Sequence, residues 1–314
     1  MSPFDDELSQ QLRGVNSPMI SPDGRVVAYV RISADPIGRT LTSEVVIVNV
    51  ADRKELAVFP GAAPHWNAGG RELSFSPTRG GKVARWLRSD AATPASPRSD
   101  GTSYNAMPAV EIRRTVRDVS IDSSGRVIAF VRSGVTEPPD VYTARLDSGG
   151  AAKALTRVNS RVVQEAIMTD AVTTALRVAG GETFRVFVLP PAGAQPGRKY
   201  PALLAVRTGA QAQSGYDFSD RFQLLATRGY GVIYVESAAA DAATSLSLGL
   251  AAAIERNGWI DTARLGVMGD GDNASAIWIA SHKAIFDRAT NLAGLLWRRD
   301  VRLYQYFPAV FTAR

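Results

Sequence analysis

The sequence predicts a β + α/β protein, with an all-β first half followed by an α/β second half. Three copies of one turn motif in the first half predict a series of β-hairpins. After about residue 178, short apolar strands alternate with helix-length segments, as they do in parallel α/β sheets. A chain of 314 residues is long enough for about two domains, each with its own core. We therefore expect one domain over residues 1–178 and a second over residues 179–314.

The turn motif is a glycine followed by an arginine and then by alternating apolar residues. It reads SPDGRVVAYV, WNAGGRELSFS and SIDSSGRVIAFV, which aligns Gly24, Gly70 and Gly125. Glycine tolerates the positive φ of a tight turn, and the alternation indicates a half-buried strand. The copies lie about 50 residues apart, near the ~40–50 residues of a propeller blade. We therefore expect a partial β-propeller with blades of the WD or TolB kind.

The repeats also predict which side chains of the first half face the core. These are Val27, Tyr29, Leu73, Phe75, Ile128 and Phe130. Residues 43–50 and 140–145 are expected to form further strands, and residues 89–108, rich in Pro, Ser and Asp, a loop. Three turns support about three or four blades, whereas closed propellers have 4–8. We therefore expect an open propeller that is completed by self-association or by a partner.

In the second half, the pattern of apolar residues predicts strands and helices in alternation. Strands are expected at residues 184–189, 200–206, 231–236 and 264–269, and helices at residues 218–228, 246–257 and 274–285. Open α/β sheets bind their ligands at the carboxyl ends of the strands. The loops after residues 206, 236 and 269 are therefore the expected place of a site.

The composition excludes several kinds of site and partner. The chain has no cysteine, which excludes disulfides, thiolate metal sites and cysteine nucleophiles. The net charge of +6 is divided evenly between the halves. The sequence therefore has no concentrated basic segment of the kind that indicates nucleic-acid binding. No apolar run approaches the ~18 residues of a membrane span, and the acidic start at Asp5, Asp6 and Glu7 lacks the pattern of a signal peptide. We expect a cytoplasmic protein that binds neither nucleic acid nor membrane.

Five segments together resemble the prolyl oligopeptidase/dipeptidyl peptidase family of serine peptidases, particularly its acylaminoacyl-peptidase-like bacterial members. They are SPDGRVVAYV, LTRVN, KYPALLAV, LLATRGYGVIYVE and WIDTARLGVMG. This family joins an N-terminal β-propeller to a C-terminal α/β-hydrolase domain. It cleaves peptides, and the propeller restricts their access to the active site. The resemblance implies that the second half is an α/β-hydrolase domain. Because the chain ends at Arg314, we expect this domain to lack its C-terminal strands.

The resemblance fails at the nucleophile elbow, which in the family reads Gly-x-Ser-x-Gly-Gly. The corresponding residues here are Gly269, Asp270, Gly271, Asp272, Asn273 and Ala274. Gly271 occupies the serine position and has no side chain that could attack a carbonyl group. Ser275 is nearby, but it is expected within the helix that follows rather than at the apex of the elbow.

The rest of the family's catalytic apparatus is also missing from the sequence. The oxyanion loop, His-Gly-Gly-Pro in the family, is replaced by Arg207, Thr208, Gly209 and Ala210. A further loop, an Asn-x-Arg-Gly-Ser-type stretch in the family, begins here at Glu236 and continues as Ser-Ala-Ala-Ala. The triad's Asp and His lie well downstream of the elbow in this fold. His282 is expected on the helix after the elbow, pointing away from the sheet, and His65 is expected to be structural.

These losses predict a pseudo-peptidase with no catalytic residue, which binds a peptide or protein in a crevice at the strand ends. The candidate crevice residues are Arg207, Thr208, Gly209, Glu236, Asp270 and Asp272. Acidic residues between a strand and a helix also suit a divalent cation, but they commonly serve as helix caps, so we expect no metal and no cofactor. Two alternatives remain open: a hydrolase with residual or altered activity, and a truncated remnant without function.

Overall fold

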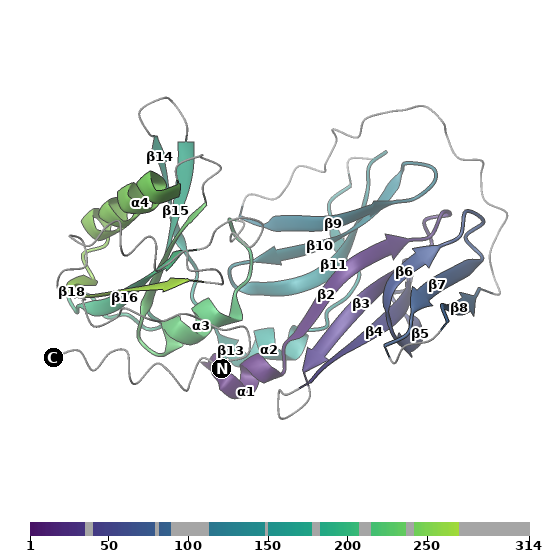
Figure 1. Cartoon of the computed structure of the whole chain (residues 1–314), viewed down its shortest axis with the longest axis horizontal. Helices are drawn as coiled ribbons and strands as arrows, with labels where there is room; N and C mark the ends of the chain where they lie inside the picture. The colour runs from purple at the N-terminus through teal and green to yellow at the C-terminus, as the bar shows by residue number, and fades with distance from the viewer. Residues whose placement is uncertain are drawn as a thin grey trace. The chain divides into compact units, whose positions relative to one another are not determined.

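The computed structural model describes residues 1–34, 40–78, 82–88, 113–147, 150–177, 183–206, 215–236 and 242–269 (Figure 1). The chain forms two compact units. The sheet unit comprises Asp6–Glu165, and the α/β unit comprises Met1–Asp5 together with the chain from Ala166 onward. Strand β1 (Ser2–Pro3) pairs with β13 (Ala166–Ile167), which ties the first residues to the α/β unit. The division at residue 165 therefore differs from the boundary expected at residue 178.

The sheet unit consists of three antiparallel sheets. The first contains β2 (Arg13–Ile20), β3 (Val26–Ala34), β4 (Leu41–Asn49) and β5 (Glu55–Pro60). The second contains β6 (Ala62–Trp66), β7 (Glu72–Ser76) and β8 (Ala84–Leu87). The third contains β9 (Thr115–Ile121), β10 (Val127–Gly134), β11 (Glu137–Arg145) and β12 (Lys153–Ala154). Neighbouring strands are consecutive in the chain, and the short helices α1 (Asp6–Gln10) and α2 (Ser160–Glu165) are the first and last elements of this unit in the sequence.

Each copy of the turn motif forms the hairpin between the first two strands of its sheet. Gly24, Gly70 and Gly125 have φ of 72°, 65° and 68°, as the sequence predicted. In each turn the glycine N–H donates to the carbonyl three residues earlier, over 2.8 to 3.1 Å. The repeat is therefore a repeat of structure as well as of sequence.

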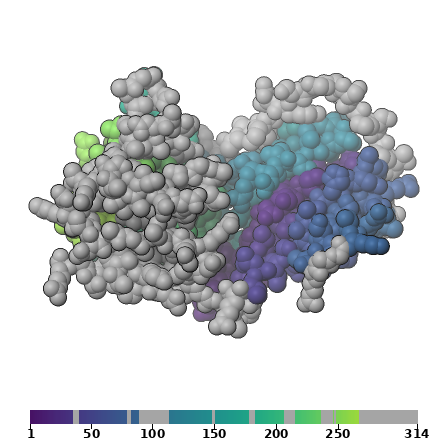
Figure 2. All heavy atoms as spheres, in the orientation of Figure 1, coloured from purple at the N-terminus to yellow at the C-terminus, as the bar shows by residue number. Residues whose placement is uncertain are grey.

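The first sheet is buried on both faces because the other two sheets pack against it. Alternate residues of β3 point to opposite sides, so Val27 and Tyr29 meet the third sheet while Val26 and Ala28 meet the second. In the space-filling view the purple first sheet lies between the teal third sheet and the blue second sheet (Figure 2). All six side chains predicted to face the core are at most 5% exposed.

The α/β unit is built on a five-stranded sheet in the order β14-β15-β17-β16-β18. Its strands are β14 (Val172–Arg177), β15 (Thr183–Leu189), β16 (Tyr200–Val206), β17 (Gly231–Glu236) and β18 (Ile260–Gly269). The last three are parallel, as predicted, but β15 pairs antiparallel with both β14 and β17. The expectation of a wholly parallel sheet is corrected here, because a short hairpin connection such as that between β14 and β15 permits only antiparallel pairing.

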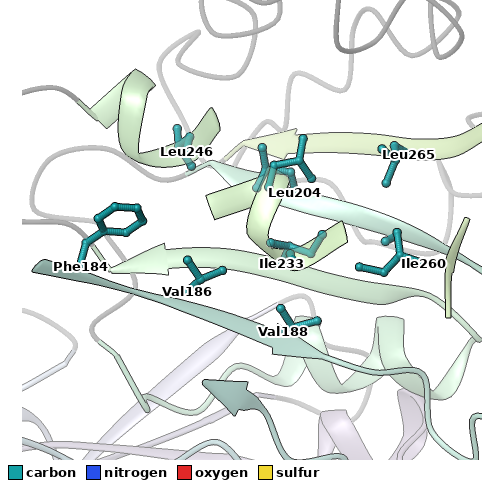
Figure 3. Close-up of a cluster of buried hydrophobic side chains, with 11 residues drawn as sticks. Phe184, Val186, Val188, Leu204, Ile233, Leu246, Ile260 and Leu265 are labelled. Atoms are coloured by element: carbon teal, nitrogen blue, oxygen red, sulfur yellow. The ribbon is translucent and has the colours of Figure 1, made fainter. Parts of the chain in front are cut away.

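Among the described residues, one helix packs on each face of this sheet. Helix α4 (Ala242–Arg256) covers the face on which side chains of β15, β16, β17 and β18 form the largest apolar cluster (Figure 3). Helix α3 (Asp220–Thr227) covers the other face and begins after Ser219, whose hydroxyl accepts from the Phe222 amide. The predicted helix over residues 274–285 and the predicted loop over residues 89–108 lie outside the described residues. Within the part that the structure describes, no helix is long and apolar enough to cross a membrane.

Candidate functional site

The predicted site lies at the carboxyl edge of the sheet in the α/β unit, where three parallel strands end together. Val206 at the end of β16 pairs with Gly269 at the end of β18, and Ala205 pairs with Tyr234 of β17. The loops that follow the three strands therefore leave the sheet at one edge. This is the arrangement in which open α/β sheets bind ligands.

The predicted site residues are the last residues of these strands or come directly after them in the sequence. Glu236 is the last residue of β17, and its backbone pairs with Arg185 of β15. Gly269 is the last residue of β18. Outside the described residues lie Arg207, Thr208, Gly209, Asp270, Gly271, Asp272, Asn273, Ser275 and His282. The structure thus gives the strand ends from which the candidate residues extend.

Behind this edge, an aromatic cluster fixes the face of the sheet that α3 covers. The rings of Phe187 and Tyr234 stack with centroids 4.8 Å apart, and the Tyr216 ring packs edge-on against Phe187 at 5.0 Å. Phe222 of α3 lies 5.2 Å from Tyr234. This cluster could not be predicted from the sequence, because its members come from separate elements and do not recur at a regular interval along the chain.

The opposite, amino end of the same strands is fixed by close packing. A side chain on Gly231, at the start of β17, would place its Cβ 2.3 Å from the Trp259 ring. The carbonyl of Trp259 also accepts a hydrogen bond of 2.8 Å from the amide of Tyr200, at the start of β16. Both contacts set the positions of β16 and β17, and with them the positions of the strand ends at the candidate site.

A second candidate site, which no motif predicted, is a cavity of about 380 Å³ in the sheet unit. Four arginines line it, Arg13, Arg31, Arg53 and Arg157, and Tyr29 belongs to its wall. They come from β2, β3, the β4–β5 connection and the segment after β12. The cavity therefore opens between the first and third sheets.

A polar network fixes the segment after β12 that lines this cavity. The Thr156 hydroxyl donates to the Asp140 carboxylate over 2.6 Å and accepts from the Val141 amide over 2.9 Å. The Val158 amide donates to the same carboxylate over 3.0 Å. Burial raises the pKa of Asp140, and these hydrogen bonds and the charge of Arg157 only partly oppose that rise. The network holds the backbone of this wall in place.

Two of the remaining predictions concern histidine and metal sites. His65 lies on β6 with an exposed side chain, and its carbonyl accepts from the Ser74 hydroxyl. Among the residues that the structure describes, no group of three or more His, Asp and Glu side chains is arranged to hold a metal ion.

No protein-family model and no curated protein sequence matches this chain. Solved structures, however, are similar in fold. The Pyrococcus horikoshii acylaminoacyl peptidase has a TM-score of 0.68 at 11% identity, over 90% of this chain and 78% of that one. An acylaminoacyl peptidase in complex with Z-Gly-Gly-Phe-chloromethyl ketone has a TM-score of 0.63 at 11% identity, over 88% and 77%.

The AtxE2 isopeptidase, in a variant with astexin3-dC4 bound, has a TM-score of 0.60 at 13% identity, over 88% of this chain and 76% of that one. The similar structures are serine peptidases of the prolyl oligopeptidase family, with a propeller and an α/β-hydrolase domain. The resemblance predicted from the five sequence segments is therefore confirmed at the level of the fold.

Proposed function

We propose that the protein is a non-catalytic relative of these peptidases, which binds a peptide or protein segment at the carboxyl edge of its α/β sheet. The observation that supports this most is the alignment of β16, β17 and β18 at that edge. Strand β18 ends at Gly269, where the strand before the nucleophile elbow of a hydrolase would end. The residue two positions later is Gly271, which cannot form an acyl-enzyme.

The loop after β16 supports the same proposal. In an oxyanion hole, preorganised N–H donors face the charge that develops on the substrate oxygen, and loss of one donor costs about 10²–10³ in rate. The family's His-Gly-Gly-Pro is replaced here by a sequence that starts with Arg207. A guanidinium group at this edge suits binding of a peptide carbonyl or carboxylate. The edge is thus better equipped to hold a peptide than to cleave it.

We further propose that the three antiparallel sheets are blades of a partial propeller. Each sheet has the strand order of a meander, and each begins with the hairpin that carries the repeated glycine. Closed propellers use 4–8 blades, so a partner or a second copy would complete this one. Light scattering tests the self-association: we expect a mass above that of one 33.6 kDa chain, and a monomer at all concentrations would contradict it.

Binding of a blocked tripeptide tests the proposed function. The probe is fluorescein-labelled Z-Gly-Gly-Phe amide, and the readout is fluorescence anisotropy with chromatography of the probe afterwards. We expect saturable binding with the probe recovered intact. Arg207→Ala, at the carboxyl end of β16, should weaken binding about tenfold because a charged hydrogen bond is lost.

The matched control is Arg198→Ala, an exposed arginine just before the amino end of the same strand. This variant should bind as the wild type does. Cleavage of the probe would favour a hydrolase with residual activity. Failure to bind, or equal losses in Arg207→Ala and Arg198→Ala, would contradict the proposed crevice.

A further inference from the structure

We propose that the cavity in the sheet unit is a binding site for a small molecule with a phosphate monoester group. The site is separate from the crevice proposed for the α/β unit and is built entirely from residues of the sheet unit. Its volume, about 380 Å³, lies within the range of about 300–1,000 Å³ in which proteins bind small molecules. Inorganic phosphate alone would leave most of this space empty.

The charge of the cavity favours an anion. Four arginines line it against one acidic residue, Glu55. Only Arg31 is neutralised, by ion pairs of 3.0 Å to Glu44 and to Glu55. Among the described residues, the guanidinium groups of the other three arginines form no ion pair and no side-chain hydrogen bond. These three are Arg13, Arg53 and Arg157.

The carboxylate of Asp140 also lies near this wall, and it attracts Arg157 electrostatically. Its oxygen already accepts from the Thr156 hydroxyl and the Val158 amide. Three exposed arginines thus line the cavity with their guanidinium donors available. Guanidinium groups bind phosphate oxygens in a bidentate manner, which makes arginine the preferred residue for phosphate recognition.

A buried donor without an acceptor is the second, independent observation. Tyr29 is fully buried and forms part of the cavity wall. The Arg31 guanidinium lies near its hydroxyl but can only donate, so the Tyr29 O–H has no acceptor within the described structure. Burial raises the pKa of Tyr29 far above 10, with the charge of Arg31 opposing the rise, so the hydroxyl keeps its proton at neutral pH. A ligand oxygen that accepts from this O–H would satisfy a group that the protein leaves unsatisfied.

The number of donors distinguishes phosphate from carboxylate. A phosphate monoester offers three terminal oxygens and a charge of about −1.5 to −2 at neutral pH, which matches three arginines and a phenol. A carboxylate carries one charge and two oxygens, so it would leave part of this donor set unused. The apolar side chains of Val48, Leu155 and Val158 also line the cavity and suit an apolar group on the ester.

Calorimetric titration of the full chain with phenyl phosphate tests this inference. We expect saturable binding at one site per chain, weaker binding of inorganic phosphate, and binding of benzoate at least about tenfold weaker than that of phenyl phosphate. Arg53→Gln and Arg157→Gln should each weaken phenyl phosphate binding about tenfold. Tyr29→Phe should weaken it about fivefold. Thermal unfolding of each variant verifies that it is folded.

Arg161→Gln is the matched control. Arg161 is also an exposed arginine of this unit, but it pairs with Glu165 on α2 and does not line the cavity. This variant should bind phenyl phosphate as the wild type does. The inference is overturned if phenyl phosphate fails to bind, if benzoate binds equally well, or if Arg161→Gln loses as much affinity as Arg53→Gln.

Discussion

The two units join their layers by different physical means. In the α/β unit, helix and sheet meet through apolar side chains, and glycines allow the closest approaches: a Cβ on Gly249 of α4 would lie 2.6 Å from Val235. In the sheet unit, the apolar contacts between sheets are supplemented by polar bonds at the turns. The Ser123 amide and hydroxyl both donate to the Pro22 carbonyl, across two copies of the repeated turn.

We therefore expect different kinds of substitution to destabilise the two units. Close-packed layers lose stability when volume is added, whereas turn contacts lose it when a charge or a backbone conformation is changed. Single substitutions in each unit separate these two responses.

The largest effect is expected where the sheet unit buries a charge. The Arg88 guanidinium is 1% exposed and donates to both carboxylate oxygens of Asp23, at 3.0 and 2.8 Å. Arg88→Met leaves the Asp23 carboxylate without this partner and should cost about 3 kcal/mol in the free energy of unfolding, measured with urea. The control is Arg85→Met, which breaks an exposed pair with Glu72 and should cost less than about 1 kcal/mol. Equal losses would remove the contrast between buried and exposed charge.

The next effect is expected in the α/β unit, where added volume should matter most. Gly231→Ala drives a methyl group into the Trp259 ring, which must move, and should cost about 2 kcal/mol. Gly258→Ala, next to the same tryptophan, meets nothing within 4 Å and should change the stability by less than about 0.5 kcal/mol. Urea unfolding followed by tryptophan fluorescence measures both. A tolerated Gly231→Ala would mean that this contact does not fix the strands.

A smaller effect is expected at the repeated turn of the sheet unit. Gly24→Ala forces an alanine to φ of 72° and places its Cβ 3.2 Å from the Asp122 carboxylate. The expected loss is about 1–2 kcal/mol. Gly14→Ala, in strand β2 of the same sheet, makes only an ordinary contact of 3.5 Å with Ile32 and should not destabilise the protein. Thermal unfolding of both variants checks this, and a loss only in Gly14→Ala would contradict the role of the turn.

The smallest effect is expected in the pH dependence of the same unit. Burial raises the pKa of Asp23, but hydrogen bonds from Ser21, Arg88 and the Arg25 amide outweigh it and leave the pKa below its usual 3.8. The carboxylate therefore stabilises the folded state above the pKa of the unfolded chain, and this contribution is lost as the pH falls through the lower folded value. The stability difference between wild type and Asp23→Asn should shrink by about 1 kcal/mol or less between pH 6 and pH 2.5. A difference that grows toward low pH would contradict the pairing.

Much of the fold could be predicted because the strands carry strong local signals. The run 231–236 and the run 200–206 form β17 and β16 with the predicted bounds. Helix ends were less accurate: α4 begins at Ala242, before the residues expected at 246, because small residues such as Ala and Ser give no apolar period. The antiparallel strand β14 was missed because none of its residues is buried and its apolar and polar side chains do not clearly alternate.

The two candidate sites differ in how much of each could be predicted from the sequence. The common position of the strand ends in the α/β unit was predictable because parallel pairing brings the ends of β16, β17 and β18 together, whatever the loops contain. The cavity was not, because its arginines are separated by long stretches of chain and follow no common motif. Arg13 and Arg53 come near Arg157 only because the first and third sheets pack against each other.

Labelling with a fluorophosphonate probe tests most directly whether the α/β unit lacks serine chemistry. Intact-mass measurement of the full chain after incubation, with an active acylaminoacyl peptidase as the positive control, gives the number of adducts. We expect none on the wild type, because the residue predicted for the nucleophile position of the elbow is Gly271. We also expect none on Gly271→Ser, because the family's oxyanion loop is missing after β16. An adduct on Ser275 of the wild type, together with turnover of a peptide ester, would contradict a non-catalytic crevice.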